Sequence, residues 1–162
     1  MAVWTGTPFD ATAYGALTAA DWDGSVRDGF TAFGALTAYT PTLTNWTLGN
    51  GTITGGYGQV QKRVFFYASL TFGSTTAAAA SSPTFTLPVT ASNANISGHL
   101  DGLFLDASAS AVYGAGAYAG NTTTVGLYVK GTNDVYNAPS TTSPFTWTTS
   151  DVIVVRGWYW AA

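Results

Sequence analysis

Few residues in this sequence could do chemistry. The 162 residues include no cysteine, one histidine (His99) and eight acidic residues, all of them aspartates. The lack of cysteine excludes disulfide bonds, thiolate metal sites and cysteine nucleophiles. A Ser-His-Asp triad would have to use His99, and no Gly-x-Ser-x-Gly motif lies near it. We therefore interpret His99 as an ordinary strand or turn residue.

The aspartates offer the other catalytic possibility, because glycoside hydrolysis uses two carboxyl groups about 5 to 9.5 Å apart. Asp101 and Asp106 are five positions apart in a strand-like segment, so their side chains should point to opposite faces. Asp21 and Asp28 would lie about 10 Å apart along a helix, and Arg27 beside them indicates a solvated helix face. These spacings disfavour a small glycan-active enzyme, although pairs between different strands stay open. We expect a protein that is not an enzyme.

Metal and cofactor sites find equally little support. Residues 21–24 begin like a calcium-binding loop, but Val26 and Ala32 occupy the positions where that loop needs Gly and Glu. With no cysteine and one histidine, a single chain is not expected to hold zinc. Three copies of His99 meeting on a threefold axis are the one metal site left open. We expect no metal and no cofactor.

The composition narrows the possible partners. Charged residues make up 8% of the chain, against about 25% in ordinary soluble domains. The net charge of −3 argues against nucleic-acid binding, which needs clustered basic residues. No apolar stretch is long enough to cross a bilayer, and the first residues do not resemble a targeting signal. Solubility then depends on surface hydroxyls and amides, or on partner subunits that cover much of the surface.

Residues 1–17 form a leader with no regular hydrophobic period. The segment nevertheless carries four large side chains, which disordered segments usually lack. We expect it to be extended and to attach the protein to another surface through Trp4, Pro8, Phe9 and Tyr14.

Residues 18–38 carry the one helix pattern. Thr18 can cap the helix, and Asp21 follows three positions later as in a capping box. An apolar stripe at helical spacing comprises Trp22, Val26, Phe30, Phe33 and Leu36. Three glycines make the helix marginal on its own, so the stripe should pack. It either lies on its own domain or packs against copies of itself in an oligomer.

Residues 39–162 are predicted to form an all-β domain, a single jelly-roll-like β-sandwich of about eight strands. Residues 49–51 (Gly-Asn-Gly) are typical of a turn. The clearest strand is residues 59–72, in which apolar and polar positions alternate. The other expected strands are residues 41–48, 84–89, 96–105, 111–118, 123–130, 144–148 and 152–160.

Four aromatic residues could be exposed on strand faces. Phe65 and Tyr67 lie opposite the more apolar face of their strand, which carries Val64, Phe66, Ala68, Leu70 and Phe72. Trp158 and Trp160 share one face of the last strand. If exposed, they mark a subunit interface or a platform for sugar rings. We favour the interface, because the low charge already requires covered surface.

A series of short segments made of turn and aromatic residues runs along the first half of the chain. They are residues 17–22 (LTAADW) with 26–28 (VRD), 39–44 (YTPTLT), Trp46 with 49–52 (GNGT), 56–57 (GY), 64–66 (VFF), 71–76 (TFGSTT) and 83–88 (PTFTLP). These segments resemble a family of small virion proteins of tailed bacteriophages, described as minor structural or minor tail proteins. The resemblance covers roughly residues 18–91, and the chain departs from the family pattern at Asp23 and at residues 29–30.

The resemblance implies a virion protein made in the host cytoplasm, commonly a homotrimer, with an N-terminal attachment segment and an outer β domain. Its partners would be its own copies and the major capsid protein or another virion protein. A chain without a long shaft suits a capsid decoration protein or a short head fibre. The alternative is a tail-tip adhesin that binds host surface glycans through exposed aromatic residues.

Overall fold

The structure, a computed structural model, describes residues 36–93, 98–130 and 135–162. Within these residues the chain forms ten strands and no helix, so the expected all-β, sandwich-like class is confirmed. The strands are β1 (Thr37–Tyr39), β2 (Leu43–Thr44), β3 (Thr52–Val60), β4 (Arg63–Thr71), β5 (Thr84–Thr86), β6 (His99–Asp106), β7 (Ala111–Ala119), β8 (Thr124–Lys130), β9 (Tyr136–Asn137) and β10 (Val152–Trp160).

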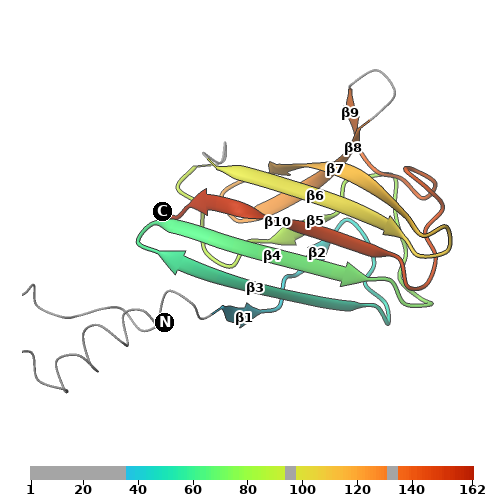
Figure 1. The fold of residues 1–162 in the computed structure, drawn as a ribbon, viewed down its shortest axis with the longest axis horizontal. Helices are drawn as coiled ribbons and strands as arrows, with labels where there is room; N and C mark the ends of the chain where they lie inside the picture. Colours follow the sequence, from blue (N-terminus) through green and yellow to red (C-terminus); the bar gives the residue numbers. More distant parts are fainter. Residues whose placement is uncertain (1–35, 94–97, 131–134) are drawn as a thin grey trace, which may run out of the picture.

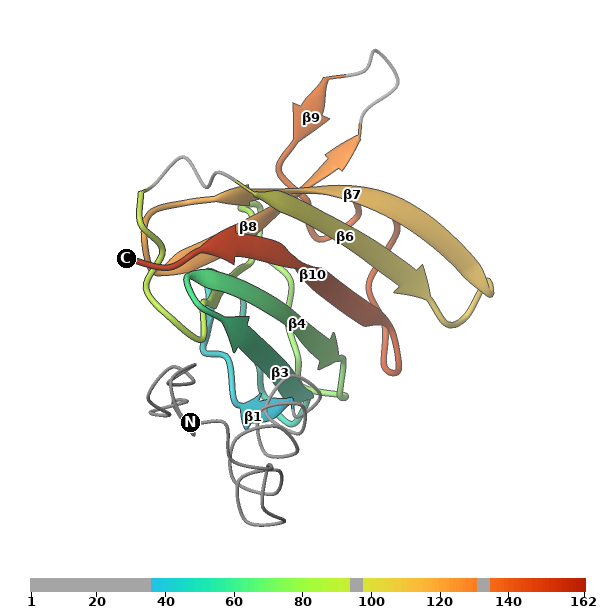
Figure 2. The ribbon, with the colours of Figure 1, turned by 60° about the vertical axis from the view of Figure 1, so that its left-hand side comes forward.

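The strands form one curled antiparallel sheet. Its order is β1-β3-β4-β10-β6-β7-β8-β5-β2, and β9 pairs with β8 beside this path. Figure 1 shows β3, β4, β10 and β6 as a front layer, with β8, β5 and β2 behind it. Figure 2 shows the sheet bending at β7 and β8, and β9 projecting away from the rest. The curl places two layers face to face, as in a β-sandwich.

The core lies between these layers and follows the predicted alternation of β4. Val64, Phe66, Ala68 and Leu70 are all buried. They share the space with inward-facing residues of β10, β6, β8 and β5, which include Ile153, Val155, Tyr159, Phe104, Val125, Leu127 and Phe85. A side-chain carbon at Gly102 of β6 would collide with Leu127 of β8. Glycine at this position therefore lets the two layers approach.

Residues 41–48, expected to form one strand, contain only the two residues of β2. The extended backbone ends at Asn45, whose φ of 69° lies in the left-handed region. The Asn45 amide donates to Ser82 O (2.9 Å), and the Trp46 indole donates to Ser81 O (2.7 Å). These hydrogen bonds hold Trp46 in a buried position, and the chain leaves the strand at Asn45 to make them.

Residues 144–148 were also expected to form a strand, which is wrong. Their aromatic side chains fill one end of the core instead. Trp147 stacks on Phe72 with ring centroids 5.0 Å apart, and it lies 4.4 Å from the Phe145 ring. The Trp147 indole donates to Ser140 O (2.9 Å), which fixes the loop without strand pairing.

Two boundaries near the N-terminal part also differ from expectation. Thr37 and Ala38, predicted as the end of the helix, lie in β1 because they pair with Tyr57 and Gly56 of β3. The expected strand 59–72 begins with the last two residues of β3 and a turn at residues 61–62, and only then continues as β4. The rest of β3 was not predicted, since three glycines interrupt its pattern. Leu36 lies in neither a helix nor a strand, and residues 18–35 of the expected helix and the whole leader lie outside the described residues. In the described ranges no helix is long and apolar enough to cross a membrane.

Candidate functional site

The four aromatic residues singled out by the sequence gather on one side of the sheet. We call the side of β3, β4, β10, β6 and β7 that faces away from the core the outer face. Phe65 of β4 is paired in register with Trp158 of β10, which is paired with His99 of β6. Two residues further along the strands, on the same side of the sheet, Arg63 is paired with Trp160. Phe65, Trp158, Trp160, Arg63 and His99 therefore form one cluster, named here the aromatic corner.

The Arg63 side chain lies against both tryptophan rings of the aromatic corner. Its guanidinium carbon lies 4.5 Å from the Trp158 ring centroid and 4.9 Å from that of Trp160. The two indole rings are 6.1 Å apart, edge to face. Arg63 Nε is buried without a hydrogen-bond partner in the described residues. The arginine is thus engaged through the ring faces, an attraction between a cation and the electron-rich side of an aromatic ring.

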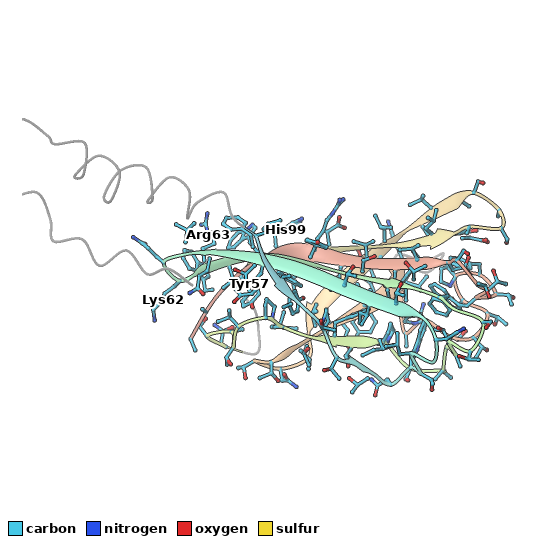
Figure 3. All side chains as sticks on the ribbon, turned by 90° about the horizontal axis from the view of Figure 1, so that it is seen from below. Tyr57, Lys62, Arg63 and His99 are labelled. Carbon is cyan, nitrogen blue, oxygen red and sulfur yellow. The ribbon has the colours of Figure 1, made fainter. Side chains whose placement is uncertain are left out.

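The aromatic corner is open to solvent. Phe65 is 42% exposed and Trp160 38%, so the expectation that Phe65 and Tyr67 lie opposite the buried face of β4 is confirmed. Figure 3 shows Arg63 and His99 at the same end of the sheet, on its outer side. This end contains the β3–β4 turn, the last residues of β10 and the first residue of β6.

Few charges interrupt the outer face. On β3, β4, β10 and β6 the outward positions carry three charged side chains, those of Arg63, Arg156 and Asp101. Arg156 and Asp101 pair with each other at 3.4 Å, with both side chains about half exposed. Most of the large apolar side chains exposed in the described residues lie on or against this face: Leu36, Val60, Phe65, Tyr67, Val112, Tyr136 and Trp160.

Leu36 connects the aromatic corner to the N-terminal segment. It is the one residue of the predicted helix stripe that the structure describes, and it is 64% exposed. A side-chain carbon at Gly58 on the outer face would lie 3.7 Å from Leu36 Cδ2. Gly58 is the register partner of Phe65. Residues 1–35 therefore join the domain beside the aromatic corner.

The candidate catalytic aspartates are separated, as expected. Asp101 lies on the outer face, whereas Asp106 points inward and accepts hydrogen bonds from Ser108 Oγ (2.7 Å) and Ala109 N (3.0 Å). The bond from Ser108, supported by that from Ala109, holds the pKa of Asp106 below its usual range. Asp151 is fully buried and accepts from Ala107 N (2.9 Å) and Thr148 N. Both carboxylates thus serve loop structure.

His99 is the first residue of β6 and is exposed at the aromatic corner. Among the described residues no three histidine or aspartate side chains gather as potential metal ligands. Of the other predicted site residues, eight lie outside the described ranges: Trp4, Pro8, Phe9, Tyr14, Trp22, Val26, Phe30 and Phe33.

Comparisons with protein-family models, with curated proteins and with solved structures found no match.

Proposed function

We propose that this chain is a non-enzymatic surface protein of a bacteriophage particle, a capsid decoration protein or short head fibre. Residues 1–17 attach it to the major capsid protein or another virion protein, and the β domain is displayed outward. The observation that supports this assignment is the aromatic corner, which is exposed beside the point where residues 1–35 join the domain. The resemblance to small virion proteins supports the same assignment.

The aromatic corner is suited to contact between subunits. Aromatic residues and arginine are enriched at protein interfaces, and charged residues are depleted at their centres. Here Phe65 and Trp160 are exposed around an arginine whose charge is already engaged by two indole rings. The proposed partner at this surface is a second copy of the chain, and the resemblance implies three copies.

A matched pair of variants tests the oligomer. Phe65→Asn changes the aromatic corner, and Val112→Asn changes an equally apolar exposed residue at the opposite end of the outer face. Light scattering of the wild type at micromolar concentration should give about three times the chain mass of 16.8 kDa. Phe65→Asn should dissociate the assembly and Val112→Asn should not. A monomeric wild type, or equal effects of both variants, would contradict this interface.

A second experiment tests attachment. The full chain carrying Trp4→Ser and Phe9→Ser should keep the far-ultraviolet circular dichroism of its β domain. It should no longer sediment with phage particles that lack their own copy of the protein. Binding equal to that of the wild type would place the attachment surface elsewhere on the chain.

A second candidate function is a tail-tip adhesin that binds host glycans. One specific observation favours it: three tyrosine rings on the outward side of the sheet lie over glycines. The two candidates differ in the location of the chain on the particle.

A further inference from the structure

Three tyrosines on the outward side of the sheet lie over glycines of neighbouring strands. A side-chain carbon at Gly56 would lie 2.7 Å from Cε1 of Tyr67, and one at Gly126 would lie 2.5 Å from Cε1 of Tyr118. In both cases the tyrosine is the register partner of the glycine. The third ring, that of Tyr136, covers Gly116, where a side-chain carbon would lie 2.6 Å from its Cε1.

A ring that covers a glycine lies down on the sheet instead of standing up from it. Its inner side then contacts backbone, and its outer side is available to another molecule. Tyr67 and Tyr136 are 40% and 55% exposed. Tyr118 is less exposed, and its ring stacks on Tyr128 with centroids 4.2 Å apart and planes inclined by 21°. The result is a set of flat aromatic surfaces along the sheet.

The register places two of these rings, those of Tyr67 and Tyr136, in one band across the strands, and Tyr118 lies beside the band against Tyr128. Gly56, Tyr67, Arg156, Asp101, Gly116 and Tyr128 are successive partners from β3 to β8. Strands lie about 4.8 Å apart, so Gly56 and Gly116, four strands apart, are separated by roughly 19 Å along the curved sheet. Tyr67 and Tyr136 cover these two glycines, and the Arg156–Asp101 pair lies between them. We call this band the tyrosine row.

We propose that the tyrosine row binds an extended, uncharged polysaccharide chain that runs across the strands. The carbon-bound hydrogens on one side of a sugar ring carry slight positive charge, and they pack on the negative face of an aromatic ring. Tyrosine also supplies a hydroxyl for the polar groups of the sugar. The half-exposed Arg156 and Asp101 offer a donor and an acceptor between the rings.

The charge of the tyrosine row favours a neutral ligand. Its two charged members are opposite in sign and 3.4 Å apart, so the band between the rings has no excess positive charge to attract an acidic polymer. Lys130, the register partner of Tyr136, lies at one end of the row. The separation of the rings favours a chain of several sugars over a single sugar, because only a chain reaches both Tyr67 and Tyr136. This inference rests on the second candidate function for its biological setting alone, since binding to polysaccharide does not require a particle.

Electrophoresis of the full-length protein in native gels that contain a polysaccharide tests this inference. The gels hold one of three neutral polymers (mixed-linkage β-glucan, galactomannan or dextran) or the acidic polymer alginate. We expect at least one neutral polymer to retard the wild type. Tyr136→Ala and Tyr67→Ala should each weaken that retardation by about tenfold, whereas Tyr136→Phe should stay within about threefold of the wild type.

Two further variants distinguish the loss of ring stacking from a general disruption of the fold. Gly116→Ala retains every tyrosine but displaces the Tyr136 ring, so it should also weaken binding. Val112→Ala, on the same side of the sheet but outside the row, should bind as the wild type does. The inference is overturned if none of the three neutral polymers retards the protein, if alginate alone does so, or if the tyrosine variants bind normally. None of these results bears on whether the protein is found on a particle.

Discussion

The guanidinium carbon of Arg63 lies 4.5 Å from the centroid of the Trp158 ring, and Trp160 flanks the same arginine at 4.9 Å. An arginine and two tryptophans from adjacent strands thus order one another at the end of the sheet, beside the residues that lead to the N-terminal segment. The proposed subunit contact depends on this arrangement, because it keeps the exposed indole of Trp160 in one orientation.

Removal of the arginine should loosen the aromatic corner. We expect Arg63→Ala to lower the free energy of unfolding by about 1 kcal/mol, since both the cation–π contacts and the packing of the side-chain stem are lost. Tryptophan fluorescence should shift to longer wavelength as the indoles gain water. Lys62→Ala, next in sequence and exposed, is the control and should change neither quantity.

Close approach of the two layers at Gly102 gives a second prediction. Alanine there would bring a methyl group against Leu127, and its carbon would lie 3.2 Å from Ala115 Cβ. Such overpacking costs about 1–3 kcal/mol. Gly114→Ala, on the neighbouring strand, meets nothing within 4 Å and should be neutral or slightly stabilising. Urea denaturation of both variants measures the difference, and equal midpoints would show that the layers can separate without cost.

A third prediction concerns the hydroxyl of Tyr159. It donates to Val89 O (2.7 Å) and accepts from Val89 N (3.2 Å) inside the core. Tyr159→Phe leaves both backbone groups unpaired and should cost about 1–2 kcal/mol. Burial raises the pKa of Tyr159 to about 12 from 10.0. Its stabilising contribution is therefore fully present below pH 10 and lost as pH rises from 10 through about 12, so alkaline titration should destabilise the wild type more than Tyr159→Phe.

Acid should act in part through Asp106. Its hydrogen bonds, that from Ser108 foremost, lower its pKa from the ordinary value of 3.8. A carboxyl with a depressed pKa stabilises the fold above its unfolded value, and the contribution is lost as pH falls through the folded value. Asp106→Asn should therefore be less stable than the wild type at pH 6, with a gap that closes below about pH 4. A gap that stayed constant in urea denaturation across this range would exclude the carboxylate as its cause.

The sequence predicted the structure best where buried and exposed side chains alternate along a strand without interruption. In β4 the pattern of residues 64–72 alone distinguished buried from exposed positions, and Phe65 and Tyr67 are exposed as expected. In β3 the pattern failed because Gly55, Gly56 and Gly58 resemble strand breakers. Their reason lies outside the strand: Tyr39 covers Gly55 and Tyr67 covers Gly56. Such pairs depend on register between strands, which one sequence does not reveal.

In the candidate site too, features that depend on one strand were predicted, whereas features that depend on the pairing of strands were not. The common face of Trp158 and Trp160 followed from their spacing, but Arg63 was missed because its role depends on the pairing of β4 with β10. The tyrosine row was missed for a similar reason, since its members come from seven strands, β3, β4, β6, β7, β8, β9 and β10. Residues 144–148 were wrongly predicted to form a strand because aromatic residues occupy alternate positions there. These residues fill the core from a loop instead.

A cryo-electron microscopy map of the particle of the phage that encodes this chain tests the central proposal most directly. We predict density for the β domain on the outside of the capsid, in groups of three, with the aromatic corners in contact and residues 1–17 against a capsid subunit. A map in which the chain lies only at the tail tip would support the adhesin instead. A particle with no density for the chain at any position would contradict its assignment as a virion protein.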